Sequence, residues 1–392
     1  MGINRETSNP EGGVIDRDKN GEITGILREK AYDVLVRPKL PKSSLAKKKK
    51  WLLSALKYAA SKGLTLVQTN DKDAFSAYKE LENENNLPIR VMLTIHYEEL
   101  DYFSQKSMKT GDGSTIFWLG RVKLFADGSL GGETAALKEP YVGTRNKGIL
   151  TETPAELKQH ITNIIKNGWE AEIHAIGDRA IEVAISAIEK AKKELESDYQ
   201  TKKYSHVITH CQVTPPETVT KMKNSGIIAN IQPIFINTDM HWAEKRLGEK
   251  RIKYSYAWKN LLDAGIPCAG GSDSPIEPID PLFGIYSAVT RKDLNGFPER
   301  GWHPEQKLSI EEAISLFTLG GANIAHLKNK IGVLKEGGFA DFIILNRDIF
   351  EIEPEKIKDL EVVATIVNGK IVYLSEDYSK YVTIFDRPNG LP

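Results

Sequence analysis

The stretch EAEIHAIGDRAIEVAISAIEKAKKELE, residues 170–196, decides the fold class. A short run of mainly apolar residues ends near His174 and is followed by a Gly-Asp turn. From Ala180 to Glu196 the apolar residues then recur at helical spacing. A short strand followed directly by an amphipathic helix is typical of a βα unit in a parallel sheet.

The same alternation of a short apolar run with an amphipathic segment continues along most of the chain. Amphipathic segments predict helices at 51–63 (with Gly63 as the C-cap), 74–84, 154–167, 180–196, 215–224 and 252–264. Short apolar runs predict strands at 64–68, 89–96, 120–125, 170–175, 206–211, 227–232 and 266–271. This alternation predicts an α/β fold, a TIM-like (β/α) barrel. A closed barrel has eight strands, so one strand is either absent or not recognised among the apolar runs.

The two ends of the chain do not show this strand-helix alternation. VIDRDKNGEITGILRE, residues 14–29, predicts a hairpin around Asn20-Gly21. From Ile331 onward, β-rich segments are joined by glycine-based turns with no long helix between them. We therefore expect a (β/α) barrel over 1–330 and a small β-rich unit over 331–392.

Composition excludes several classes of protein. Of the 392 residues, 40% are hydrophobic and 27% are charged, which is enough apolar material for a folded core. Lysine and arginine total 53, as do aspartate and glutamate, so no net charge recruits nucleic acid or an anionic membrane. The chain has two cysteines and no apolar leader or span, which favours a cytoplasmic protein. We expect neither nucleic acid nor membrane as a partner.

Four polar residues follow the apolar cores of predicted strands: Lys123, His174, His210 and Asp273. In a barrel these strand ends meet at one mouth, where active sites are built. Imidazole nitrogen and carboxylate oxygen are ligands suited to a divalent metal. Each residue taken singly also has an ordinary structural explanation, as a satisfied polar group, a turn residue or a salt-bridging lysine. Together, they predict a metal site.

Four further residues are weaker candidates. His96 ends a predicted strand and either contacts substrate or belongs to the turn. Asp127 and Asp178 follow the strands that end near Lys123 and His174, and they either order loops or contact substrate. His206 lies four residues before His210, so strict alternation puts both on one side of the strand, with His206 deeper in the core.

The longer motifs resemble the amidohydrolase superfamily, in particular its amidohydrolase 3 branch of enzymes like N-substituted formamide deformylase. The segments that carry the resemblance are VKLFADGSLGGETAAL, EIHAIGDRAI, ITHCQ, GSDSPIEPIDPLFGIYSAVTR, LSIEEAISLFTLGGANIA and IGVLKEGGFADFIILNRD. The resemblance spans nearly the whole chain, from GGVIDRDKNGEITGILRE to VATIVNGKIVY.

The resemblance implies a role for each candidate. Lys123 would be carboxylated and bridge two metals, with His174 and His210 as further ligands. Asp273 would bind metal and carry a proton from the attacking water to the leaving nitrogen. The cofactor would be a divalent metal, zinc first, with manganese, iron and nickel as alternatives. The reaction implied is hydrolysis of a non-peptide C–N bond, amide or formamide-like, in a small-molecule substrate.

The sequence also departs from the family pattern. The family's first strand ends in His-x-His, which supplies two ligands, yet no two of this chain's eight histidines are two residues apart. The resemblance therefore implies an N-terminally shortened member, through a wrongly assigned start, a gene fragment or a natural truncation. Its metal-dependent hydrolase barrel over 1–330 would be N-terminally incomplete and lack its first strand, and the β-rich unit over 331–392 would be one part of a composite sandwich. The alternative function is a catalytically inactive fragment, or a binding or assembly module. An open barrel exposes strand edges, which makes a homo-oligomer possible.

One loop differs as well. Gly131-Gly132-Glu133-Thr134 stands where relatives often have Gly-Ser-Arg-Thr. The substrate contacts of this loop are therefore expected to differ from those of the family.

Overall fold

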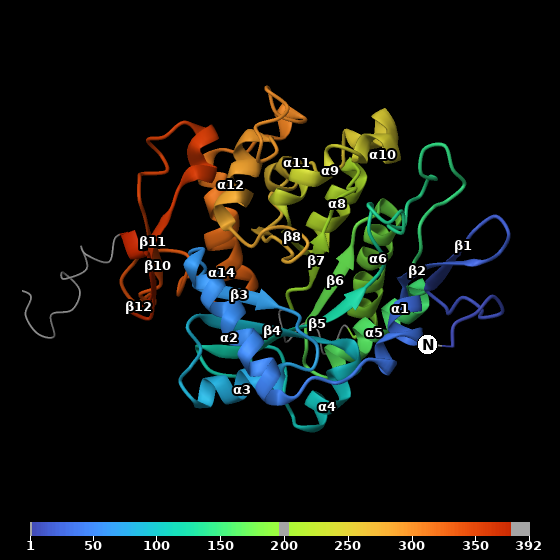
Figure 1. Ribbon diagram of the computed structural model, residues 1–392, viewed down its shortest axis with the longest axis horizontal. Coiled ribbons are helices and arrows are strands. Elements are labelled where there is room, and N and C mark those ends of the chain that lie inside the picture. The colour runs from blue at the N-terminus through green and yellow to red at the C-terminus, as the bar shows by residue number, and fades with distance from the viewer. Residues whose placement is uncertain (1, 196–203, 378–392) are drawn as a thin grey trace, which may run out of the picture. The chain divides into compact units, whose positions relative to one another are not determined.

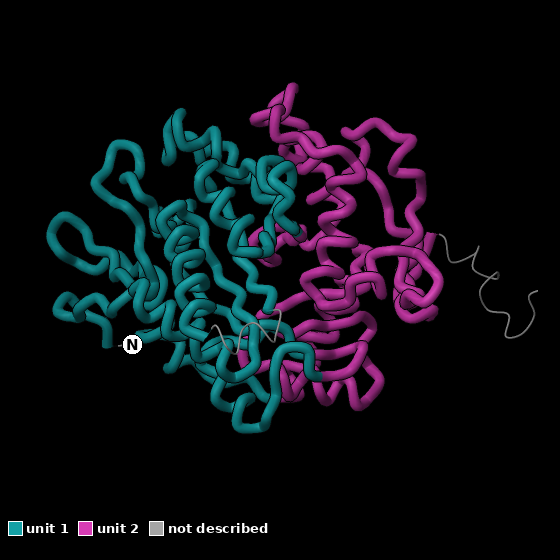
Figure 2. The backbone as a smooth tube through the Cα atoms, turned by 180° about the vertical axis from the view of Figure 1, so that it is seen from behind, with its two compact units in different colours: residues 1–44, 94–112, 119–268 teal, residues 45–93, 113–118, 269–392 magenta. Residues whose placement is uncertain are grey.

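The computed structural model describes residues 2–195 and 204–377 (Figure 1). The chain divides into two compact units, coloured separately in Figure 2. The first unit holds residues 1–44, 94–112 and 119–268. The second holds residues 45–93, 113–118 and 269–392. Both units are therefore built from segments that are far apart in the sequence.

Seven strands form the main sheet and follow one another in chain order. They are β3 (Leu66–Thr69), β4 (Arg90–His96), β5 (Phe117–Phe125), β6 (Ala171–Ala175), β7 (Val207–His210), β8 (Ile228–Ile231) and β9 (Cys268–Gly270). The pairs β3/β4, β5/β6, β6/β7 and β7/β8 are parallel. All seven predicted strands are confirmed, and the fold is the expected TIM-like α/β class with seven strands among the described residues.

Helices α5 (Pro154–Lys166) and α6 (Asp178–Glu194) accompany β5 and β6 in the first unit. Thr153 begins α5 with a capping box, in which its hydroxyl accepts from the Glu156 amide and Glu156 accepts from the Thr153 amide. On α6, Ile181, Ile185 and Ile188 recur at helical spacing and are buried. Both helices match the sequence prediction; Glu196, the end expected for the second, lies outside the described residues.

The first unit contains several shorter elements. They are α1 (Lys30–Leu35), η1 (Arg37–Lys39), η2 (Tyr97–Glu99), α4 (Leu100–Gln105), α8 (Pro216–Asn224), η3 (Pro233–Phe235), α9 (Ile236–Asp239), α10 (Ala243–Ile252) and α11 (Trp258–Asp263). The single helix expected at 252–264 is wrong, because Ser255 pairs with Val213 and the Tyr256 amide donates to the Gln212 carbonyl. These contacts take the backbone out of the helix between α10 and α11.

The predicted N-terminal hairpin is present in the first unit. Strands β1 (Gly13–Arg17) and β2 (Ile23–Glu29) pair antiparallel. The turn forms because the Asp18 carboxylate accepts from the amides of Asn20 and Glu22, each at 2.9 Å. Gly21 completes the turn with φ of +81°.

The second unit is built around α2 (Leu45–Ser61) and α3 (Phe75–Asn83), which pack with β4. Gly63 ends α2 with φ of +82°, as predicted. The unit also contains α12 (Pro281–Thr290), η4 (Pro304–Gln306), α13 (Ile310–Ser315), the π-helical turn η5 (Leu316–Gly320), α14 (Gly321–Ile324) and η6 (Pro354–Asp359). No helix in residues 2–195 or 204–377 is long and apolar enough to cross a membrane.

A small antiparallel sheet completes the second unit. Strands β10 (Phe342–Leu345), β11 (Val362–Val367) and β12 (Lys370–Leu374) pair in chain order. They form the β-rich region expected after Ile331, while residues 378–392 of that prediction lie outside the described residues. The Thr365 hydroxyl donates to the Ala60 carbonyl at 2.7 Å, which joins this sheet to α2. The boundary at residue 330 stays a prediction.

A buried ion pair joins β4 to the segment that leads into β10. The Arg90 Nε and Nη2 atoms lie 2.5 and 2.9 Å from the two carboxylate oxygens of Asp341. Both side chains are almost fully buried, and the guanidinium also stacks on Phe339, 4.3 Å from the ring centroid. Because the two residues are 251 positions apart, this pair fixes a long-range contact of the fold.

Replacing Arg90 with Ala should lower the free energy of unfolding by about 3–5 kcal/mol, since it leaves the Asp341 carboxylate buried and unpaired. Urea titration followed by circular dichroism measures this. Lys79→Ala is the control, because Lys79 forms an exposed pair with Glu82 that should contribute less than about 1 kcal/mol. A similar small loss in both variants would contradict the role assigned to the buried pair.

Candidate metal centre

Lys123 lies near the end of β5 with its side chain buried. The β5/β6 register sets Lys123 beside Glu172, and the Lys123 Nζ lies 3.7 Å from Glu172 Oε1. The same carboxylate oxygen accepts from the Thr209 hydroxyl at 2.9 Å. Lys123 therefore belongs to a buried polar row that runs across β5, β6 and β7.

His174 occupies the end of β6, and its Nε2 lies 3.0 Å from the Gly128 carbonyl oxygen. A carbonyl oxygen only accepts hydrogen bonds, so Nε2 carries the ring proton in this contact. The Nδ1 atom then holds the lone pair. A metal-binding histidine is typically oriented in this way, by a hydrogen bond from its other ring nitrogen.

His210 ends β7 and is oriented in the same manner by Gln232. Its Nδ1 lies 2.8 Å from the Gln232 Oε1, while the Gln232 Nε2 donates to the Asn230 carbonyl. The amide oxygen therefore accepts, Nδ1 carries the proton and Nε2 holds the lone pair. Burial, then electrostatic interactions with His174 and Lys123, lower the pKa of His210 well below its usual value. The ring is neutral at neutral pH, as a metal ligand requires.

The sequence interpretation missed Gln232. It is the last residue of the predicted strand 227–232 and directly follows the last residue of β8. The rule that selected the other candidates, a polar residue at a strand end, could therefore have found it.

The two imidazoles lie side by side, with ring centroids 4.5 Å apart and planes at 71°. The backbone at His210 makes this possible. The β6/β7 register pairs His174 with Thr209, so regular alternation would point His210 to the opposite face. Instead, His210 has φ of +82° at the strand end, and this left-handed conformation redirects its ring.

His206 does not share a face with His210, which corrects the expectation from alternation. Val207, the next residue, pairs with Glu172, so the opposite face of β7 carries His206. Its ring is fully buried and its Nδ1 accepts from the Ala171 amide at 3.1 Å. Burial lowers the pKa of His206 to about 3. His206 is therefore a neutral core residue.

The carboxylate of Asp127 joins two loops at the ends of β5 and β6. It accepts from the amides of Ile176, Gly177 and Ala136 at 3.0, 2.8 and 2.9 Å. A Cβ at Gly177 would collide with the Ala136 carbonyl, so glycine is needed for this approach. Of the two roles predicted for Asp127, the contacts support the ordering of loops.

The remaining candidates lie at other strand or helix ends. Asp178 begins α6, is buried, and accepts from the amides of Lys138 and Arg179 at 2.9 and 3.0 Å; burial raises its pKa. His96 ends β4 with its ring centroid 6.2 Å from that of Phe125. Substrate contact by His96, Asp127 or Asp178 stays a prediction.

Asp273 follows β9 and belongs to the second unit, whereas Lys123, His174 and His210 belong to the first. Like His210, Asp273 has a left-handed backbone, with φ of +54°. Such strain in a non-glycine residue costs about 1–3 kcal/mol and recurs at functional sites. Its ligand role stays a prediction.

The first unit supplies two oriented imidazoles, which suit zinc and related divalent metals. Residues 2–195 and 204–377 contain no group of three or more His, Cys, Asp or Glu side chains that could hold a metal. Catalytic zinc usually has three protein ligands. The buried amine of Lys123 would become an oxygen ligand only after carboxylation. The two imidazoles of this unit therefore fit a divalent metal, while the carboxylation and the ligand role of Lys123 stay predictions.

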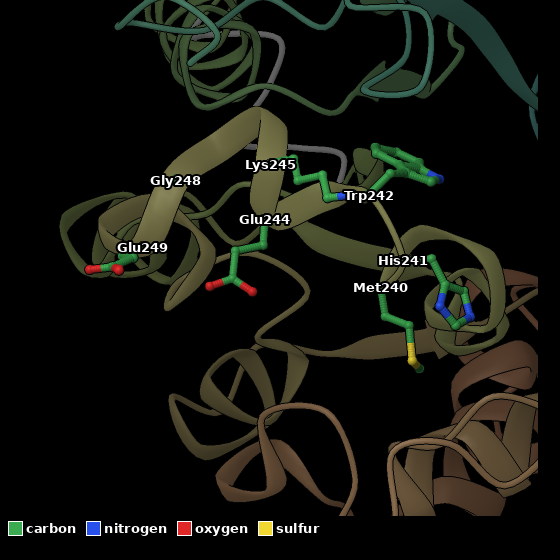
Figure 3. Close-up of a pocket in the computed structure, with 7 residues that line it drawn as sticks. All are labelled: Met240, His241, Trp242, Glu244, Lys245, Gly248 and Glu249. Carbon is green, nitrogen blue, oxygen red and sulfur yellow. The ribbon is translucent and has the colours of Figure 1, made fainter. Parts of the chain in front are cut away.

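A separate pocket of 230 Å³ lies at the start of α10 and the segment before it (Figure 3). It is lined by Met240, His241, Trp242, Glu244, Lys245, Gly248 and Glu249, none of which is a predicted site residue. Beside it, the Arg246 guanidinium stacks on Trp242, 4.4 Å from the ring centroid, and its Nε lies 3.3 Å from the Glu133 carboxylate. Arg246 thereby ties α10 to the divergent Gly131–Thr134 loop.

Comparison with known proteins gives a consistent result. A sequence profile of the amidohydrolase family matches residues 1–373. "Putative amidohydrolase YtcJ" of Bacillus subtilis is 37% identical over 381 residues, which cover 95% of this chain and 70% of that protein. "N-substituted formamide deformylase" of Arthrobacter pascens is 23% identical over 394 residues, covering 95% of this chain and 69% of the enzyme.

A solved structure is also similar. An uncharacterized metal-dependent hydrolase from Pyrococcus furiosus aligns with a TM-score of 0.72 and 31% identity. The alignment covers 87% of this chain and 67% of that one. The chain thus spans about two thirds of the length of each of these three proteins.

Replacing Asp127 with Asn should lower the free energy of unfolding by about 3 kcal/mol, because an amide NH₂ group would face backbone amides that need an acceptor. Urea unfolding measures this loss. Asp101→Asn, at an exposed position on α4, is the matched control and should be nearly neutral. Equal stability of the two variants would refute the anchoring role of Asp127.

The buried neutral state of His206 predicts how stability depends on pH. Unfolding restores the pKa from about 3 to the usual 6.5, so only the unfolded chain binds this proton between those values. The contribution of His206 to the free energy of unfolding is complete above pH 6.5 and falls by about 1.4 kcal/mol per pH unit below it.

Urea titrations across that pH range test the dependence on His206. His206→Gln keeps an acceptor for the Ala171 amide but cannot titrate, so its stability should fall less steeply with acid. Parallel slopes for the variant and the unmodified chain would contradict the assignment.

Proposed function

We propose a function from the premise that this chain belongs to the amidohydrolase family, whose profile matches residues 1–373. The chain is a metal-dependent hydrolase that cleaves a non-peptide C–N bond, amide or formamide-like, in a small molecule. The observation that carries the proposal is the pair of neighbouring imidazoles of His174 and His210, each oriented by a hydrogen bond through its other ring nitrogen.

In this proposal His174 and His210 hold the metal, together with carboxylated Lys123 and with Asp273. A bound divalent cation would activate water and polarise a carbonyl oxygen. Asp273 would take the proton of the attacking water and pass it to the leaving nitrogen as the C–N bond breaks. Gln232 and the Gly128 carbonyl keep the two rings in their metal-binding tautomers.

The substrate class is supported by the name of the Arthrobacter relative, an N-substituted formamide deformylase. Zinc is the proposed metal, with manganese, iron and nickel as alternatives, since imidazole suits all of them. His96, Asp127 and Asp178 are proposed to contact substrate. We also propose a cytoplasmic location, supported by two free cysteines, and no nucleic-acid or membrane partner. Self-association is a further proposal.

A second function is favoured by a specific observation. The sequence has no His-x-His, and the described residues bring together no three His, Cys, Asp or Glu side chains as a metal site. The chain would then be a catalytically inactive relative, or a binding or assembly module. Metal retention distinguishes this alternative from the hydrolase.

The metal content of the purified chain, measured by elemental analysis after incubation with zinc and desalting, tests the proposal. We expect about one or two zinc ions per chain, and His174→Ala or His210→Ala should remove them because each variant deletes a ligand. His160→Gln is the control, since this partly exposed histidine on α5 pairs with Glu152 and not with either ligand.

A folded chain that retains no zinc or manganese would reject the hydrolase in favour of the second function. Zinc retained equally by His174→Ala and the unmodified chain would reject the ligand assignment. A zinc-loaded chain is then assayed on N-substituted formamides and small amides. Their hydrolysis, lost in Asp273→Asn, is the expected result.

A further inference from the structure

We propose that Glu29, the last residue of the N-terminal hairpin, is a positioning residue that fixes the loop 128–134 against His174. The inference rests on the proposed function, because it concerns the geometry of one of the proposed metal ligands. It adds to the site a residue that lies 145 positions from His174 in the sequence and that was not among the candidate site residues.

The carboxylate of Glu29 reaches directly into this loop. Its Oε1 accepts a hydrogen bond from the Thr134 hydroxyl at 2.6 Å, and the Thr134 hydroxyl in turn accepts from the Ser129 amide at 3.0 Å. A Cβ at Gly128 would collide with both the Glu29 carboxylate and the Thr134 hydroxyl. The loop therefore closes around the Glu29 carboxylate, and glycine at position 128 makes room for it.

The neighbouring residue, Arg28, holds the same loop at a second point. Its Nη1 donates to the Gly132 carbonyl, while its Nε donates to Asp16 at 2.6 Å. Asp16 lies on β1, the other strand of the hairpin. The Asp16 carboxylate thus orients the guanidinium, which donates to the loop 128–134. The hairpin therefore contacts this loop through two adjacent side chains, those of Arg28 and Glu29.

The base of the hairpin is also fixed to the end of β5. A Cβ at Gly12 would collide with the Thr151 carbonyl. The Thr151 amide donates to the Ala126 carbonyl at 3.1 Å, and its hydroxyl donates to the Phe125 carbonyl. The base of the hairpin therefore packs on Thr151, and Thr151 is in turn hydrogen-bonded to the end of β5, just before the loop 128–134.

The backbone conformation of Glu29 would favour glycine, so the presence of a glutamate there indicates that its carboxylate has a role. Its φ of +50° and ψ of −130° are unfavourable for any residue with a Cβ, at a cost of about 1–3 kcal/mol. Glycine would adopt this conformation without strain. A strained glutamate whose carboxylate is enclosed by a loop is expected where the carboxylate has a function.

The path from Glu29 to the site is short. Glu29 binds Thr134, Thr134 binds Ser129, and the adjoining Gly128 carbonyl lies 3.0 Å from His174 Nε2. That carbonyl keeps the ring proton on Nε2 and leaves Nδ1 for a metal. Without the Glu29 carboxylate, the Thr134 hydroxyl loses its acceptor, and the Gly128 carbonyl is held less firmly against His174.

Cobalt(II) serves as the probe, because its visible absorption reports the geometry of its ligands, and amide hydrogen exchange reports the loop. Glu29→Ala should increase exchange in the segment 128–136 by about tenfold. It should weaken cobalt affinity by about 10–100-fold, as loss of an outer partner of a metal ligand does, and shift the cobalt spectrum. Glu29→Gln keeps an oxygen acceptor for Thr134 and should restore most of both properties.

Two matched variants separate positioning from stability. Glu29→Gly relieves the backbone strain, so it should unfold at a higher temperature than Glu29→Ala yet show the same loss of cobalt affinity. Glu22→Gln removes an exposed hairpin carboxylate that pairs with Arg5, and should change nothing. Native-like cobalt affinity and spectrum in both Glu29→Ala and Glu29→Gly would overturn the inference. An unmodified chain that binds no cobalt would overturn the proposed function first, and this inference with it.

Discussion

The candidate site depends on one buried carboxylate. Asp127 accepts three backbone amides, from Ala136 at one end of the loop after β5 and from Ile176 and Gly177 after β6. A buried carboxylate that accepts two or three amides is a strong, directional anchor. Because it joins the exits of two adjacent strands, it sets the frame in which the Gly128 carbonyl meets His174.

Each of the two imidazoles is oriented by a hydrogen bond to a residue that follows a neighbouring strand. The Gly128 carbonyl after β5 orients His174, and the Gln232 side chain after β8 orients His210. The strands on either side, β5 and β8, thus supply the hydrogen-bond partners of the two imidazoles on β6 and β7. The polar row of Lys123, Glu172 and Thr209 lies on the same strands and is buried, so its electrostatic interactions are poorly screened. The pKa of His210 responds to that environment.

The sequence predicted the fold well, because buried parallel strands read as apolar runs and each is followed by a helix of clear period. It also indicated Lys123, His174 and His210 through their positions at strand ends. It could not reveal the left-handed turn that redirects His210, since alternation alone puts His210 with His206. Nor could it reveal the contact of Glu29 with Thr134, because the two residues are 105 positions apart and meet only after the hairpin has docked.

The ion pair between Arg90 and Asp341 has a consequence for the order in which the protein is made. The ribosome adds about 5–20 residues per second, so the 251 residues between the two partners take roughly 10–50 s to synthesise. During that time α2, α3 and β4 are complete, yet the guanidinium has no carboxylate and the apolar surface of these elements awaits β11. The nascent chain therefore exposes the apolar surface of α2, α3 and β4 for most of translation. Chaperones can bind this surface during that time.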